Sequence, residues 1–157
     1  MKMYDSKLLD DIGKQILRIL QEEGRISFNE LGRRVGLSSP AVAERVRRME
    51  EAGVILGYKA VVNYPLIGYP IMAYLKLVVP VGQLAQADEM AISIPEVLEC
   101  HHITGRDVMI LKVLVTSVGH LEEVISQMGV FGMITTAVVL SSPIVGRSLN
   151  VPKQPGL

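Results

Sequence analysis

The chain has 157 residues, of which 49% are hydrophobic and 4% aromatic, and it carries 16 basic and 16 acidic side chains. This length accommodates one ordinary domain or two small ones, the hydrophobic fraction excludes global disorder, and the few aromatic residues disfavour stacking on single-stranded nucleic acid. The zero net charge hides a weak asymmetry, because residues 1–59 carry 11 basic and 9 acidic side chains, whereas residues 60–157 carry 5 and 7.

Three short helices are predicted in the first third of the chain. Hydrophobic residues recur there at intervals of three and four, which places them on one face of each helix. They are Leu9, Ile12, Ile16 and Ile19 in the first helix, Phe28, Leu31 and Val35 in the second, and Val42, Val46 and Met49 in the third. Ser27 and Glu30 form a capping box for the second helix, and Ser39 is expected to cap the third, with Pro40 at its first position. Only residues 35–38 separate the second and third helices, a spacing typical of a helix-turn-helix.

Strands are predicted beyond these helices. Residues 54–62 are rich in β-branched and apolar side chains and predict a strand, either a wing or a connection to the next domain. Residues 63–70 contain two prolines and a glycine and mark a domain boundary. The later hydrophobic pattern alternates between strand and helix periods; the expected strands are residues 71–79, 97–103, 108–115 and 133–140, and the expected helices are residues 84–94 and 118–128. This β-α-β-β-α-β order is the ferredoxin-like pattern.

The third predicted helix has the features of a DNA-reading helix. Its hydrophobic residues turn inward, and its outer surface combines small residues at the N-terminal end with arginines further along. This arrangement suits entry into the major groove of double-stranded DNA. The candidate DNA contacts on the second and third helices are Arg33, Arg34, Ser38, Ser39, Pro40, Ala41, Glu44, Arg45, Arg47 and Arg48. The alternative is that this surface is simply a solvated helix face.

Residues 8–58 resemble the Lrp/AsnC, or feast/famine, regulators. The resemblance rests on the segments ILRILQEEGRIS, ELGRRVGLS, RVRRMEEAGVI and GYKAVV. It implies an α+β protein in which an N-terminal three-helix winged helix-turn-helix is followed by a ferredoxin-like βαββαβ domain of the RAM or ACT type. It also implies that residues 28–47 form the helix-turn-helix, that residues 38–48 carry the DNA contacts, and that the minimal unit is a homodimer, often assembled into octamers.

Domain boundaries follow from the pattern and the resemblance together. The expected segments are a DNA-binding domain over residues 1–62, a linker over residues 63–70, an oligomerisation and effector domain over residues 71–142, and a tail over residues 143–157. The tail contains three prolines and is expected to be loosely held.

An effector site is expected in the second domain, because this family often binds amino acids or related metabolites between subunits, near a Gly-x-x-Asp turn. The turn here is Gly-x-Asp, so its aspartate comes one residue early, and the final strand carries adjacent rather than spaced threonines. The residues expected to line the site are Gly105, Arg106, Asp107, Thr135 and Thr136. Arg106 would bind a carboxylate and Asp107 an ammonium group. The alternative is an ordinary solvated β-turn.

The run Cys100-His101-His102 does not predict a metal or catalytic site. Adjacent strand residues point to opposite faces, a zinc site needs three or four ligands, and a reactive thiol needs a partner base. We therefore predict no catalytic residues, no metal site and no cofactor.

These observations predict a non-enzymatic, sequence-specific DNA-binding transcription regulator that forms homodimers or higher oligomers and responds to an amino acid or related small metabolite. The single cysteine, the lack of an apolar leader and the lack of long apolar runs predict a cytoplasmic, nucleoid-associated protein without a membrane segment. Two alternatives stay open: an architectural DNA-binding protein with little sequence preference, and a metabolite-binding enzyme or enzyme subunit.

Overall fold

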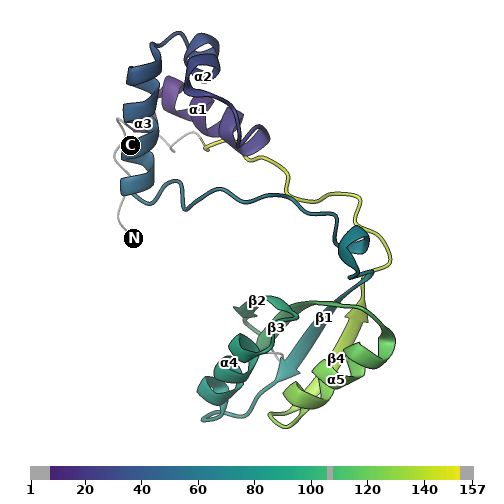
Figure 1. Ribbon diagram of the computed structural model, residues 1–157. Coiled ribbons are helices and arrows are strands. Elements are labelled where there is room, and N and C mark those ends of the chain that lie inside the picture. Colours follow the sequence, from purple (N-terminus) through teal and green to yellow (C-terminus); the bar gives the residue numbers. More distant parts are fainter. Residues whose placement is uncertain (1–7, 106–107, 153–157) are drawn as a thin grey trace. The chain divides into compact units, whose positions relative to one another are not determined.

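The structure is a computed structural model that describes residues 8–105 and 108–152. The chain divides into two compact units (Figure 1). The described residues up to Val61 and those from Ile144 onward form the first unit, which we call the helical domain. Residues 62–143 form the second unit, the sheet domain. No helix in these described ranges is long and apolar enough to cross a membrane.

The helical domain contains the three predicted helices, α1 (Asp11–Glu22), α2 (Phe28–Val35) and α3 (Ser39–Glu51). The residue before each helix accepts a backbone hydrogen bond from the first turn through its side chain; these caps are Asp10, Ser27 and Ser38. The expectation that Ser39 caps α3 is wrong by one residue. The preceding serine has the extended backbone that a cap requires, so Ser39 is the first helical residue.

A small hydrophobic core holds the three helices together. Its buried members come from all three predicted helix faces and are Ile16, Leu31, Val35, Val42, Val46 and Met49. The prediction that Phe28 joins them is wrong, because its side chain is 43% exposed. Phe28 is the first residue of α2 and lies one turn before the buried Leu31, at the end of the helix rather than over its core-facing middle.

The connection between α2 and α3 is a tight turn in which backbone lies directly against backbone. Gly36 ends α2 in the left-handed conformation, with a φ of 72°. The next residue, Leu37, donates its N–H to the carbonyl oxygen of Gly32 over 2.9 Å. A Cβ atom at Gly32 would lie 2.5 Å from the carbonyl oxygen of Leu37. A side chain at residue 32 would therefore push the turn away from α2.

The segment after α3 is not a strand, so the strand predicted over residues 54–62 is wrong. The N–H groups of Val54 and Ile55 both donate to the carbonyl oxygen of Met49, at 2.8 and 3.1 Å. Their side chains pack against the helical core. Beyond Ile55 the segment is exposed, with Leu56 94% and Val61 97% exposed. No strand among the described residues pairs with it, so its apolar composition alone does not make a strand.

The described part of the C-terminal tail is tied to α1, whereas the sequence suggested a loosely held tail. The side-chain amide of Gln21 donates to the carbonyl oxygen of Leu149 over 3.0 Å. The Gln21 side-chain oxygen accepts from the Leu149 N–H, also over 3.0 Å. One glutamine thus satisfies both backbone groups of a tail residue that follows it by 128 positions.

The sheet domain has the predicted β-α-β-β-α-β order. After a 3-10 helix (Tyr64–Ile67), its elements are β1 (Ile71–Val78), α4 (Leu84–Ser93), β2 (Val97–His102), β3 (Met109–Val115), α5 (Val118–Gly129) and β4 (Met133–Val138). The strand order is β2-β3-β1-β4, and all neighbours are antiparallel. Figure 1 shows α4 and α5 on the same face of the sheet.

The core of this domain lies between that face and the two helices. Alternate residues of β1 and β3 are buried in it, among them Leu75, Leu77 and Leu111. The residues between them, such as Tyr74, Lys76 and Ile110, belong to the opposite face because side chains alternate along a strand. Neither α4 nor α5 covers that face (Figure 1).

Gly32→Ala is expected to lower the free energy of unfolding of the helical domain by about 1–3 kcal/mol, the range for forcing atoms into a packed site. The new methyl group would meet the Leu37 carbonyl oxygen. Thermal unfolding followed by circular dichroism measures the change. Gly119→Ala is the matched control, because a Cβ there would meet its nearest atom, the Ser117 hydroxyl, at an ordinary 3.9 Å. Equal stability of G32A and the unaltered chain would contradict the close approach.

Candidate nucleic-acid interface and effector site

The candidate DNA contacts lie on α2, on α3 or at the turn between them. At the N-terminal end of α3 the small residues Pro40 and Ala41 are exposed, and Ser39 is half-buried. The Ser38 hydroxyl accepts a hydrogen bond from the Ala41 N–H over 3.4 Å, so this side chain closes the end of the helix. The start of α3 is therefore narrow and carries no bulky side chain.

A carboxylate on the outer surface of α3 holds two arginines; we call Glu44, Arg47 and Arg48 the Glu44 clamp. Arg47 binds Glu44 through two nitrogens, with Nε 2.8 Å from Oε2 and Nη2 2.7 Å from Oε1. Arg48 donates from Nε to Oε1 over 2.8 Å. These hydrogen bonds lower the pKa of Glu44 to about 2. Arg47 also binds Glu51 through Nη1.

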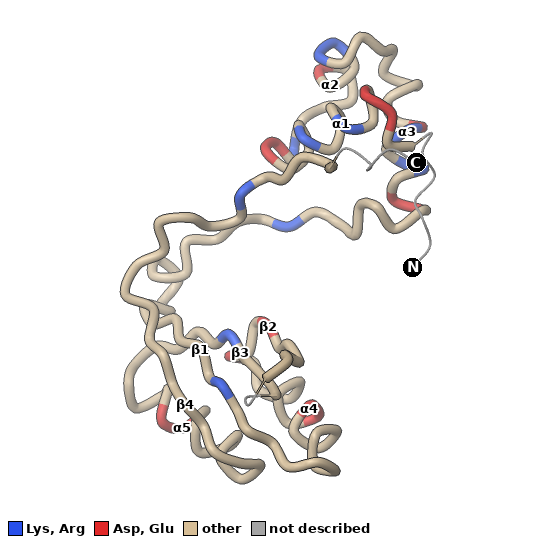
Figure 2. The backbone as a smooth tube through the Cα atoms, turned by 180° about the vertical axis from the view of Figure 1, so that it is seen from behind, with Lys and Arg blue, Asp and Glu red and all other residues tan. Residues whose placement is uncertain are grey.

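The same arrangement occurs on α2, where Glu30, Arg33 and Arg34 form what we call the Glu30 clamp. Arg33 binds Glu30 at 2.8 and 2.7 Å, and the Arg34 Nε binds it at 2.9 Å. Hydrogen bonds from both arginines lower the pKa of Glu30 to about 2. Arg34 also reaches Glu23, with Nη2 3.1 Å from Oε2. Figure 2 shows the resulting neighbouring blue and red segments on these helices.

The fifth candidate arginine, Arg45, points toward α1. Its Nη1 and Nη2 lie 2.8 and 2.9 Å from the two carboxylate oxygens of Asp10. The hydrogen bond from Arg45, together with one from the Gly13 N–H, holds the pKa of Asp10 below its ordinary value. Asp10 therefore caps α1 and ties it to α3 with one carboxylate, and Arg45 has a structural contact besides any contact with DNA.

Sequence reasoning named the arginines and Glu44 but missed that each arginine pairs with a carboxylate. A local signal was present for the two clamps, because both have the spacing Glu-x-x-Arg-Arg, and residues three and four apart are neighbours on a helix. No such signal exists for Asp10 and Glu23, which reach their partners over 35 and 11 positions.

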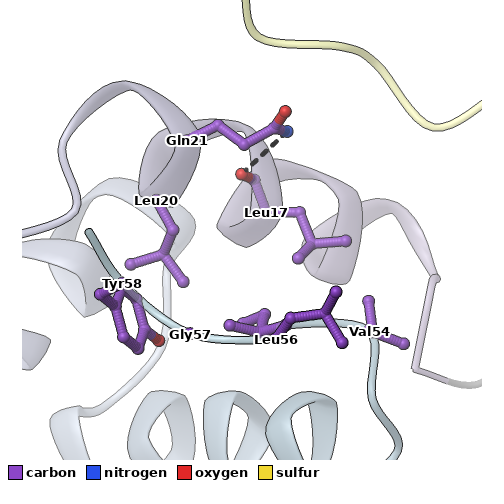
Figure 3. Close-up of a pocket in the computed structure, with 8 residues that line it drawn as sticks. Leu17, Leu20, Gln21, Val54, Leu56, Gly57 and Tyr58 are labelled. Carbon is purple, nitrogen blue, oxygen red and sulfur yellow. Dashed lines mark hydrogen bonds between the residues drawn. The ribbon is translucent and has the colours of Figure 1, made fainter. Parts of the chain in front are cut away.

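An apolar groove of about 440 Å³ lies beside these helices in the helical domain. Figure 3 shows Leu17 and Leu20 of α1 facing Leu56 and Tyr58 of the segment after α3. The Tyr58 hydroxyl donates to the Glu50 carboxylate over 3.0 Å. Burial, with a smaller effect of Glu50, raises the pKa of Tyr58 to about 12. The groove is thus fixed at one end by a contact with α3.

The described candidate effector residues lie on separate parts of the sheet domain. Gly105 lies exposed between β2 and β3, with a φ of 118°. Arg106 and Asp107 lie outside the described residues. Thr135 and Thr136 are exposed on β4, and β1 separates that strand from β3. Within one chain the sheet order places the threonines on the far side of β1 from the Gly105 turn, and the site expected between subunits stays a prediction.

The two adjacent histidines of β2 point to different partners. The His102 Nε2 lies 2.8 Å from the Asp88 carboxylate of α4, whereas the His101 Nε2 lies 3.4 Å from Glu99 on its own strand. Partial burial, with a smaller effect of Asp88, raises the pKa of the Cys100 thiol, which disfavours a reactive thiolate. Within residues 8–105 and 108–152, no group of three or more His, Cys, Asp or Glu residues could hold a metal ion.

Two family profiles match the chain. Residues 9–55 match a winged helix-turn-helix DNA-binding profile, and residues 73–149 match the Lrp/AsnC ligand binding domain. Together they cover the three helices, the sheet from the third residue of β1 onward and the described tail as far as Leu149.

Individual proteins resemble the chain over most of its length. An uncharacterized HTH-type transcriptional regulator of Bacillus subtilis, YezC, is 44% identical over 85% of this chain and 95% of its own. The HTH-type transcriptional regulator LrpA of Mycobacterium tuberculosis is 34% identical over 78% of this chain and 82% of its own. The feast or famine regulatory protein of M. tuberculosis, solved in complex with L-methionine, superimposes with a TM-score of 0.84 at 30% identity, covering 91% of this chain and 99% of its own.

Arg45→Ala is expected to lower the free energy of unfolding of the helical domain by about 1 kcal/mol, a modest value because both partners are partly solvated. Denaturant unfolding measures it. Arg18→Ala, which removes an exposed pair with Glu22 at 3.5 Å, is the control and is expected to change stability little.

The same pair predicts a pH dependence. Because the folded-state pKa of Asp10 is lowered, its stabilisation is present above the unfolded value of about 3.9 and is lost as the pH falls through the folded value. The R45A variant should therefore lose less stability on acidification than the unaltered chain. Parallel loss in both proteins would contradict this role of Asp10.

Proposed function

The chain belongs to the Lrp/AsnC family of transcriptional regulators, and from that premise we propose that it is a sequence-specific regulator that binds double-stranded DNA as a symmetric oligomer. Its two domains are accordingly a helix-turn-helix DNA-binding domain and a ligand-binding domain. We further propose that it acts in the cytoplasm at the nucleoid, where its DNA would be. It acts by binding rather than by catalysis.

One observation carries the DNA-binding proposal: a narrow, exposed N-terminal end of α3 follows a tight turn and leads to a surface of arginines and glutamates. A helix with small residues at its start can enter the major groove, and side chains further along can reach bases or phosphates. We assign these contacts to the candidate residues of α2, α3 and the turn between them, namely Arg33, Arg34, Ser38, Ser39, Pro40, Ala41, Glu44, Arg45, Arg47 and Arg48. The Glu44 clamp lies on that surface, with Glu44 43% and Arg48 61% exposed.

The uncovered face of the sheet supports association with a second copy of the chain. Strand alternation places hydrophobic side chains on this face, among them the half-buried Met72, Tyr74 and Ile110. A sheet face of this composition is usually buried against a partner rather than left in water. Pairing of two sheets would form a two-fold dimer with two DNA-binding domains, which reads two half-sites and binds DNA more tightly than one domain.

We propose that the ligand is an amino acid or a related small metabolite. The support is the ligand-binding profile over residues 73–149 and the structural relative solved with L-methionine. The proposed lining residues are Gly105, Arg106, Asp107, Thr135 and Thr136. Because β1 separates the β2–β3 turn from β4 in one chain, a site that uses both would draw the turn from one subunit and the threonines from another.

Binding to a mixed-sequence pool of DNA duplexes, over a range of salt concentrations, tests the DNA proposal. Sequencing of the retained fraction should reveal a pseudo-palindromic site, because a two-fold dimer reads two inverted half-sites. Retention without enrichment would instead support an architectural protein that binds DNA through its backbone and deformability. Absence of binding at low salt, with and without L-methionine, would contradict the proposal.

Isothermal titration with L-methionine and the other amino acids tests the ligand proposal. Thr135 and Thr136 point to opposite faces of β4, so only one of Thr135→Val and Thr136→Val should weaken binding, by about fivefold for one lost hydrogen bond. Ser126→Ala is the control, because that hydroxyl bonds only within its own helix in the described structure, to the Glu122 carbonyl oxygen at 2.8 Å. No heat with any amino acid at high protein concentration would count against this class of ligand.

A further inference from the structure

The Glu44 clamp has unused hydrogen-bonding capacity on its exposed side. The Glu44 carboxylate accepts three hydrogen bonds, two at Oε1 and one at Oε2. An ionised carboxylate offers about four acceptor positions, so Oε2 can accept one more. At a pKa of about 2 this group is ionised at neutral pH and acts only as an acceptor.

The two arginines of the clamp differ in what they have left to donate. Arg47 uses Nε, Nη1 and Nη2 for Glu44 and Glu51. Arg48 uses only Nε, and no acceptor in the described part of the chain contacts its Nη groups. Arg48 is therefore oriented by Glu44 while its two terminal nitrogens stay available for a ligand.

We propose that Glu44 and Arg48 read one cytosine–guanine base pair as a unit, with Glu44 accepting from the cytosine amino group and Arg48 donating to the guanine on the other strand. This inference rests on the proposed DNA-binding function and assigns separate roles within it. Arg47 is then a positioning residue, which holds Glu44 in place through two hydrogen bonds and contacts no base.

The hydrogen-bonding groups on the major-groove edges of the bases explain why we propose a cytosine–guanine pair. Cytosine presents the N4 amino donor without an adjacent acceptor, whereas guanine presents only the acceptors N7 and O6, and thymine the acceptor O4. Adenine has an N6 donor, but its neighbouring N7 acceptor would repel the second carboxylate oxygen. Across the same base pair, guanine N7 and O6 accept the two terminal nitrogens of an arginine. A glutamate beside an arginine thus matches a cytosine–guanine pair best.

The Glu30 clamp provides a matched control within the same chain. It has the same Glu-x-x-Arg-Arg spacing, the same hydrogen-bond pattern and the same lowered glutamate pKa of about 2. It lies on α2, outside the helix proposed to enter the groove. Glu30→Gln therefore removes the same charge as Glu44→Gln without changing a base-reading residue.

The experiment is selection of DNA duplexes from a mixed-sequence pool by the full chain, by E44Q and by E30Q at one fixed salt concentration. We expect the unaltered chain to select cytosine at one position of each half-site. E44Q should replace that cytosine with adenine, because a glutamine amide can both accept from N6 and donate to N7. The preference between the two bases should change by about tenfold or more. E30Q should keep the cytosine, even where its lost charge raises affinity for all duplexes.

Several results would overturn the proposal. One is selection by the unaltered chain of half-sites without a constant cytosine–guanine pair. Another is an equal change of affinity in E44Q and E30Q with no change of base, which would mean that Glu44 acts only through its charge. If the unaltered chain binds DNA and E44Q retains cytosine, the base-reading role fails while the proposed function stands. If the unaltered chain binds no DNA, both fail together.

Discussion

The backbone contact between Gly32 and Leu37 is the constraint on which the DNA-binding surface depends. A carbonyl oxygen occupies the space where a side chain of residue 32 would lie, so α3 must leave α2 within a very short turn. The direction of α3 is then fixed by main-chain atoms, which vary little, rather than by long side chains. Everything that the outer surface of α3 presents, including the Glu44 clamp, is oriented by this contact.

Charge pairing is the second organising feature of the helical domain. The five candidate arginines pair with five carboxylates, namely Asp10, Glu23, Glu30, Glu44 and Glu51. Attraction to DNA phosphates depends on net positive charge and on release of counterions. A surface on which arginines are paired with carboxylates has little net positive charge and would release few counterions. Within the proposed function, discrimination between sequences must then come from contacts with base edges. The pairing thus favours a specific regulator over a general DNA-coating protein.

Local periodicity was sufficient to predict the helices and the order of the sheet domain. The spacing of Ile16, Val42 and Val46 located the helical core, because burial on one face of a helix leaves a period of three to four residues. The apolar run at residues 54–62 suggested a strand wrongly, because composition alone supplies no partner strand: its first two residues pack against the helices, and Leu56 and Val61 are exposed. The distant contacts of Asp10 with Arg45 and of Gln21 with Leu149 leave no periodic trace, and the separation of β3 from β4 is a property of strand order rather than of any strand. These features can be identified only from the three-dimensional structure.

Because the tail hydrogen-bonds to Gln21, the helical domain can be completed only after the sheet domain has been synthesised. The sheet domain is in effect an insertion between two pieces of the helical domain, because the chain leaves that domain near Val61 and rejoins it near Ile144. During synthesis the three helices emerge first and can pack as soon as α3 has left the ribosome. Their contact with Leu149 must wait until the entire sheet has been made. A chain truncated anywhere in the sheet would lack the segment that joins α1. Only a full-length chain can therefore form the contact between Gln21 and Leu149.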